Sequence, residues 1–215
     1  MWSLLPDEIA ASGTRKDPGR LFAVGCPGVA FLCCVTVLPG CTSMSPIRSP
    51  SVDIVHYEVF GETAAALSTS LERERSHAVP GGEHDGYTRW RMTWQFFLDS
   101  LDGECSLTGT WTRLSTQVYL PRWSVPSDPA PGLVDKWSRY IGALAAHEEG
   151  HIQIARDAEA AVRLAASEVP PARSCSTLRK QLESTARQTI EEFKEREREY
   201  DRATNHGSTR GARFR

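Results

Sequence analysis

The chain reads WSRYIGALAAHEEGHI from Trp137 to Ile152. Apolar residues recur in this stretch at helical spacing, because Trp137 and Leu144 fall on one face of an α-helix. The same face continues through the next turn, where His147 and His151 lie four residues apart. The stretch therefore predicts a helix that packs on one side and carries two imidazoles on that side.

The five residues from His147 to His151 match the HExxH pattern of zinc hydrolases. Each histidine can offer one ring nitrogen to a single tetrahedral zinc ion. Glu148, one step round the helix, can reach a water on the open position of that metal and act as general base. The alternative is a surface helix turn that is rich in His and Glu by chance.

A catalytic zinc ion needs a third protein ligand, and two Asp or His positions come into question. Asp157, six residues after His151, stays on the same helix and points about 120° away from it, so we exclude it as a ligand. We favour His206, at the end of a second predicted helix, with Asp201 as the residue that orients a ligating imidazole. The alternative is that His206 is an exposed residue before a basic tail.

The remaining patterns predict an α+β fold. Alternating apolar and polar residues predict strands at 54–60, 87–98 and 105–120. Thr63 caps a short helix, residues 72–86 are expected to form a loop, and the prolines of 121–131 are expected to end the sheet. Helical periods follow at about 133–167 and 176–203. We therefore expect a small antiparallel β-sheet followed by two long antiparallel helices, a zincin-like arrangement.

The first 41 residues have the order of an export signal. Three basic residues precede an apolar run at 21–38, which ends in the lipobox-like tetrapeptide Leu38-Pro39-Gly40-Cys41. We expect Cys41 to be lipidated and to anchor the protein to a membrane. The alternatives are a signal that is cut without lipidation and an uncleaved anchor. Residues 42–51 then form a tether, 52–207 the folded domain and 208–215 a basic tail.

Six cysteines are present, and only two of them lie in the expected mature domain. Cys105 and Cys175 form an even pair in an exported chain, which favours one disulfide bond. The alternative is two buried free thiols. The length of 215 residues indicates one main domain, and the net charge of −2 gives no electrostatic footprint for nucleic acid.

The chain also resembles a bacterial family described as predicted secreted zinc-dependent proteases, catalogued as a domain of unknown function. Three segments carry the resemblance, namely GYTRW at 86–90, HEEGHI at 147–152 and a late YD..TNHG at 200–207. The resemblance implies a zinc peptidase of the cell envelope that acts on a peptide or protein substrate. It implies His147, His151 and His206 as zinc ligands and Glu148 as base.

A non-enzymatic reading stays open beside this one. An envelope lipoprotein with a structural or vestigial zinc site would act through protein contacts. A structural site is closed by a fourth protein ligand, and Asp201 is the first candidate for it. A hydrolase instead needs a donor to the developing oxyanion, for which Tyr200 and Asn205 are candidates.

Overall fold

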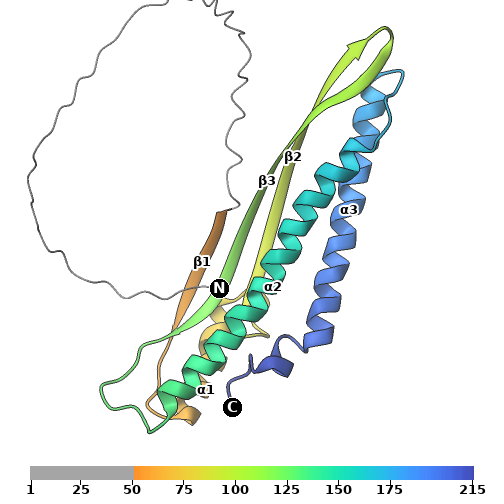
Figure 1. Ribbon diagram of the computed structural model, residues 1–215. Coiled ribbons are helices and arrows are strands. Elements are labelled where there is room, and N and C mark those ends of the chain that lie inside the picture. The colour runs from red at the N-terminus through yellow and green to blue at the C-terminus, as the bar shows by residue number, and fades with distance from the viewer. Residues whose placement is uncertain (1–50) are drawn as a thin grey trace, which may run out of the picture. The chain divides into compact units, whose positions relative to one another are not determined.

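The computed structural model describes residues 51–215, so the expected signal, Cys41 and nearly all of the tether lie outside the described residues. The elements follow in the order β1 (Ser51–Val59), α1 (Ala64–Ala78), β2 (Tyr87–Leu101), β3 (Glu104–Trp123), α2 (Leu133–Ser167), α3 (Cys175–Thr204) and a 3-10 turn at Ser208–Arg210. Figure 1 shows α2 and α3 side by side along one face of a long, narrow sheet, which confirms the α+β class. No helix in this described part is both long and apolar enough to span a bilayer.

The three strands form one sheet in the order β1-β3-β2. β2 and β3 make the predicted antiparallel hairpin, closed by Asp102 and Gly103 at positive φ angles of 52° and 80°. β1 instead pairs parallel to β3, from Ser51 opposite Ser115 to Val59 opposite Trp123. The sheet is therefore mixed and not wholly antiparallel. Alternation in the sequence tells which side chains share a face, but it does not give the direction of a partner strand that is distant in the chain.

Two elements continue beyond their predicted ends. α1 includes the charged residues up to Ala78 that we expected in a loop, because that segment contains no Gly or Pro to stop a helix. β3 passes through Pro121 and ends at Trp123. β2 begins opposite Tyr119, so Pro121 lies beyond the hairpin and pairs only with β1, a position at the edge of the sheet where proline is tolerated.

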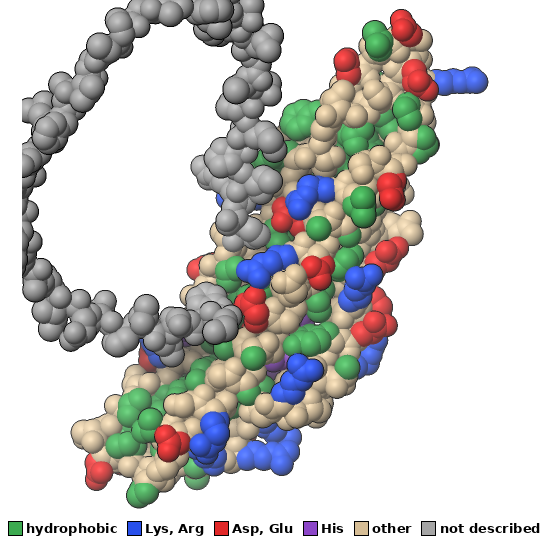
Figure 2. Space-filling model, in the orientation of Figure 1, with side chains coloured by type: hydrophobic (Ala, Val, Ile, Leu, Met, Phe, Trp, Pro, Cys, Tyr) green, Lys and Arg blue, Asp and Glu red, His purple; other side chains and the backbone are tan. Residues whose placement is uncertain are grey.

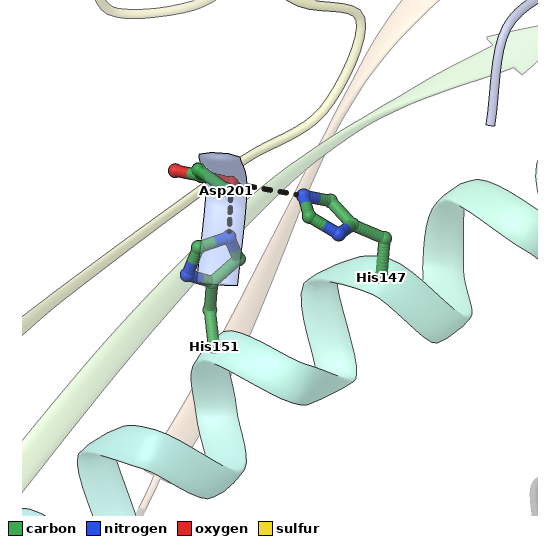
Figure 3. A group of neighbouring side chains, drawn as sticks. All are labelled: His147, His151 and Asp201. Carbon is green, nitrogen blue, oxygen red and sulfur yellow. Dashed lines mark hydrogen bonds and ion pairs between the residues drawn. The ribbon is translucent and has the colours of Figure 1, made fainter. Parts of the chain in front are cut away.

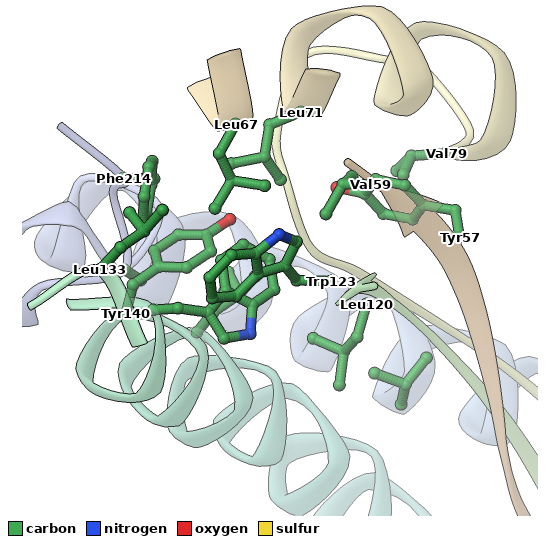
Figure 4. Close-up of a cluster of buried hydrophobic side chains, with 14 of the residues drawn as sticks. Tyr57, Val59, Leu67, Leu71, Val79, Leu120, Trp123, Leu133, Tyr140 and Phe214 are labelled. Carbon is green, nitrogen blue, oxygen red and sulfur yellow. The ribbon is translucent and has the colours of Figure 1, made fainter. Parts of the chain in front are cut away.

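Two hydrophobic clusters hold the elements together. One lies at the end of the molecule that carries α1, where Trp123 and Tyr140 pack with Leu67 and Leu71 (Figure 4). The other lies between the hairpin and the two long helices, and its members include Met92, Phe96, Leu178 and Leu182. The aromatic stripe of β2 is thus core, as its spacing predicts. Both clusters lie within residues 51–215.

The last eight residues, expected as a basic tail, fold back onto the domain. Gly207 and Gly211 have φ angles of 76° and 94°, which turn the chain. Phe214 is 7 % exposed and packs edge-on against Tyr140, with ring centroids 5.3 Å apart. Ala212 and Phe214 therefore belong to the core, while the three basic residues of the segment, Arg210, Arg213 and Arg215, stay exposed.

A disulfide bond joins Cys105 to Cys175, which confirms the predicted pairing. Cys105 also exchanges two backbone hydrogen bonds with Ala172, at 2.7 and 2.9 Å. These contacts connect the start of β3 to the start of α3. The connection between the two long helices is therefore fastened to the sheet at the end opposite to α1.

Candidate metal centre

The two histidines of the HExxH pattern lie on the buried face of α2. His147 and His151 are each 7 % exposed and point toward α3 (Figure 3). Their Nε2 atoms lie 3.2 and 3.1 Å from the same atom, Oδ1 of Asp201. The three residues offer donor atoms that all lie within 4.8 Å of one another. Ligand atoms of a tetrahedral zinc site are about 3.3 Å apart when each lies about 2.0 Å from the metal, and the two distances to Asp201 are close to this value, so the group could hold a metal ion.

The register of the helix pair explains why Asp201 meets the histidines. His151 lies 24 residues before Cys175, and Asp201 lies 26 residues after it. Antiparallel helices with a short connection bring positions of equal reach together. His206 is 31 residues after Cys175 and lies past the end of α3. The sequence points to the end of the second helix as the source of the third ligand and predicts an orienting role for Asp201. In the structure it is Asp201 that lies within 3.2 Å of a ring nitrogen of each histidine.

His206 lies beside this group without belonging to it. Asn205 and His206 have φ angles of 47° and 50°, so the chain turns sharply where α3 ends. The His206 Nδ1 atom lies 3.5 Å from Oδ1 of Asp201, and its side chain is 41 % exposed. Its ring stacks on that of His84 with centroids 3.8 Å apart. The structure therefore places His206 at the rim of the centre, in contact with one member.

Tyr200 and Gly150 form the packing beneath the histidines. The Tyr200 ring stacks on His147 at 5.0 Å between centroids and meets His151 edge-on at 5.1 Å. Its hydroxyl donates to the backbone carbonyl of His147 at 3.2 Å. Any side chain at Gly150 would overlap this hydroxyl. Tyr200 is thus engaged with α2, whereas Asn205, the other residue singled out in the sequence, lines the cleft.

Glu148 is buried and held by β2. It is 2 % exposed, and the Thr88 hydroxyl donates to its Oε2 atom at 2.7 Å. Gly86 packs against the other carboxylate oxygen, where a Cβ atom would collide with it. Burial raises the pKa of Glu148, and the hydrogen bond from Thr88 opposes that rise. A carboxylate with a raised pKa is suited to accept and return a proton near neutral pH.

His151 and Asp201 shift each other's protonation. Burial alone would lower the pKa of His151, but hydrogen bonds to Asp201 and Glu197 raise it to about 9. Burial would raise the pKa of Asp201, but hydrogen bonds from His147 and His151 hold it well below its usual range. Without a metal, a proton on His151 therefore balances the carboxylate. A divalent cation between the same atoms would take over that role.

A loop before β2 covers the centre and is anchored by Asp85. The Asp85 side chain accepts hydrogen bonds from Arg75 and Tyr140, each at 2.8 Å, and its backbone carbonyl accepts one from Tyr57 at 2.7 Å. The neighbours of Asp85 in the chain are His84 and Gly86, which reach His206 and Glu148. The anchor therefore holds both contacts in place.

The three metal donors, Glu148 and residues 83–90 line a cleft of about 630 Å³. Sequence reasoning did not assign a site role to several of its residues, namely His84, Gly86, Thr88 and Glu197. Gly86 and Thr88 lie in the GYTRW segment, which carries part of the family resemblance, so the sequence did contain an indication that these two residues belong to the site. Glu197 lies in a charged run that predicts a solvated helix face, and its contact with His151 depends on the helix register. Asp157 is exposed and bonded to Gln153, in agreement with its exclusion as a ligand.

Comparison with known proteins gives one result that covers this region. No curated protein and no solved structure matches the chain. A family model described as "Bacterial protein of unknown function (DUF922)" matches residues 54–207, which include the histidine pair, Asp201 and His206. The chain belongs to this bacterial family of unknown function, DUF922.

Proposed function

We propose that the protein is a zinc-dependent hydrolase that cleaves peptide bonds in the bacterial cell envelope. One observation carries the proposal: a buried carboxylate, Glu148, lies next to three convergent metal donors in an open cleft. A structural metal site has no need of a buried base beside it. The expected export signal and lipid anchor would place this activity outside the cytoplasm, at a membrane surface of the cell envelope.

His147, His151 and Asp201 are the three ligands in this proposal. Their donor atoms already converge, whereas His206 contacts only one of the three, Asp201, and stacks on His84. His206 then orients the Asp201 carboxylate from the cleft side, so the roles of these two residues are the reverse of those expected from the sequence. Glu197 holds His151 through its other ring nitrogen, at 3.6 Å.

When bound, the zinc ion would lower the pKa of a water molecule to about 7 and polarise the scissile carbonyl group. Glu148 accepts the proton that is released and passes it to the leaving amine. Thr88 and Gly86 hold the carboxylate of Glu148 on its two sides during this transfer. Asn205 lines the cleft and is the donor that we assign to the developing oxyanion.

The free edge of β2 offers a place for an extended peptide. β3 pairs with one edge of β2, and no strand among residues 51–215 covers the other. Thr88 connects the start of β2 directly to Glu148. A substrate that adds to this edge as a further strand would therefore pass beside the base. This geometry favours peptides in extended conformation over folded substrates.

Replacement of the base tests the proposal. Glu148→Gln keeps the shape of the side chain but cannot accept a proton, so we expect cleavage of a peptide library to fall at least 100-fold. The zinc content, measured by mass spectrometry of the metal, should be unchanged. Cleavage at the wild-type rate by this variant would contradict the mechanism, and a chelator added to the wild-type protein should abolish cleavage.

The choice of ligands has its own test. We expect Asp201→Ala to lose zinc and His206→Ala to retain it, because only Asp201 lies within reach of both ligating nitrogens. A non-catalytic envelope protein with a structural site is the second candidate, since His206 is close enough to Asp201 to close such a site. That function would be supported if His206→Ala lost the metal and the wild-type protein cleaved no peptide.

A further inference from the structure

The face of the β2–β3 hairpin that points away from α2 and α3 is basic and aromatic. We call it the outer face and define it by the outward residues of 87–97 and 109–119. Neither segment contains a single Asp or Glu, and the outward positions include Arg89, Arg91 and Arg113. The whole chain has a net charge of −2, so this basic surface does not follow from the overall composition.

The arginines of the outer face have no acidic partners. Among residues 51–215, none of the three forms an ion pair, and Arg89 bonds only to the neutral Gln117 at 2.9 Å. The helix side differs, since Figure 2 shows red and blue side chains interspersed there, and α2 and α3 carry pairs such as Arg163–Glu159. Asp53 of β1 accepts a hydrogen bond from the same Gln117 at 2.8 Å, so within residues 51–215 the positive charge available to a partner is that of Arg91 and Arg113.

Two large apolar side chains continue this surface toward the tip of the hairpin. Phe97 and Trp111 are 47 % and 48 % exposed. The strand register puts Gln95 opposite Trp111 and Phe97 opposite Gly109, so the two aromatic side chains are diagonal neighbours. A Cβ atom at Gly109 would touch the Phe97 ring at 3.5 Å, which shows that the ring lies across the glycine. Phe97 and Trp111 thus form an exposed aromatic pair, with the Phe97 ring lying against the sheet.

We propose that the outer face lies on an anionic lipid surface. Arginines attract acidic headgroups, and exposed Trp and Phe side chains partition into the interfacial layer. The strand register adds a second argument. Ser115 of β3 lies between Ser51, the first residue of β1, and Arg91 of β2. The chain from Cys41 therefore joins the sheet beside the arginines. Ten residues span at most about 34 Å, so a lipidated Cys41 would keep this face close to the bilayer.

This orientation adds a contact of the folded domain to the expected lipid anchor. A basic and interfacial surface binds an anionic membrane in addition to any covalent lipid. α2 and α3, which carry the three metal donors, cover the other face of the sheet, and Tyr87 and Arg89 at the start of β2 also line the cleft, so the cleft would open beside the bilayer surface. The inference does not depend on the proposed hydrolase activity.

The test uses residues 42–215, which lack the lipid and the signal but contain both hydrophobic clusters and the disulfide bond. Sedimentation with vesicles of phosphatidylglycerol and phosphatidylcholine should show binding that is lost with pure phosphatidylcholine. Arg91→Gln with Arg113→Gln should lower the partition coefficient about 25-fold, at about fivefold per charge. The matched control is Arg179→Gln with Lys180→Gln on α3, which removes the same charge from another surface and should have little effect.

A second readout reports the contact itself. Brominated lipids should quench the tryptophan fluorescence of this fragment, and Trp111→Tyr should remove most of that quenching. The near-UV circular dichroism of each variant checks that it is folded. No binding to anionic vesicles, or equal losses in both double variants, would overturn the proposal. So would tighter binding to soluble heparin than to vesicles, because that result identifies an anionic polymer as the partner.

Discussion

Gly86 shows how closely the candidate base is confined. Its backbone packs against one oxygen of Glu148, so a methyl group added there must displace the carboxylate. We expect Gly86→Ala to keep the zinc ligands and to lower peptide cleavage at least tenfold, because the base is no longer aligned with its proton. Zinc content and cleavage rate measured on the same preparation check this prediction.

Gly142 provides the matched control for this substitution. It lies on α2, and a Cβ atom there would meet no atom within 4 Å. Gly142→Ala should leave cleavage unchanged and raise the free energy of unfolding by about 0.5–1 kcal/mol, as expected for alanine in a helix interior. A similar loss of cleavage in both variants would show that Gly86 has no special role.

His151 gives the metal-free protein a defined pH dependence. Its pKa is raised from 6.5 to about 9, so it stabilises the fold fully below about pH 6.5 and loses this contribution as the pH rises to 9. The loss should reach about 3 kcal/mol, measured by urea unfolding in the presence of a chelator. His151→Gln should flatten this part of the profile, and an unchanged profile in that variant would contradict the assignment.

For single residues of the site, the sequence predicts contacts within one helix but not contacts between two helices. The spacing of His147 and His151 is local, so the pair follows from helix geometry alone. The contact with Asp201 instead depends on how two long helices are aligned, and a shift of one turn would exchange it for another residue. The contact of Thr88 with Glu148 is still harder to predict, because Thr88 lies on a strand and is 60 residues away in the chain.

The disulfide bond acts on whole elements, because it fastens α3 to β3 across 70 residues. Replacement of both Cys105 and Cys175 by Ala should lower the free energy of unfolding by about 4 kcal/mol, the loop-closure contribution for that length. We expect the zinc content to be unchanged, since Asp201 lies 26 residues further along α3. Chemical unfolding of wild-type and double-variant protein measures the first effect. Loss of zinc in the folded double variant would contradict the second expectation.

Element types and most boundaries followed from periodicity and from punctuating residues. Thr63 caps α1 as predicted, and α2 and α3 end within about two residues of their expected limits. The errors arose where a signal was weak or non-local. The charged segment 72–78 continues α1, because nothing in it breaks a helix, and the direction of β1 depends on a partner more than 60 residues away in the chain.

Phe214 ties the C-terminal segment to the whole molecule. Phe214→Ala should lower the free energy of unfolding by about 3–5 kcal/mol, because the ring is buried among Trp137 and Tyr140. It should also weaken zinc binding, since Gly207 packs directly against His147. Phe60→Ala is the matched control, because that ring is 53 % exposed, and it should cost less than 1 kcal/mol. Equal effects of the two substitutions in urea unfolding would contradict the role of Phe214.

The pair of long helices has a disulfide bond near one end and a candidate metal group near the other, and both links need a reagent from outside the chain. One end needs an oxidant to join Cys105 to Cys175, and the other has donor atoms arranged for a metal ion. A chain that has met neither an oxidant nor a metal ion holds neither link. The two ends of the helical pair would therefore become fixed independently, one by oxidation and the other by metal binding.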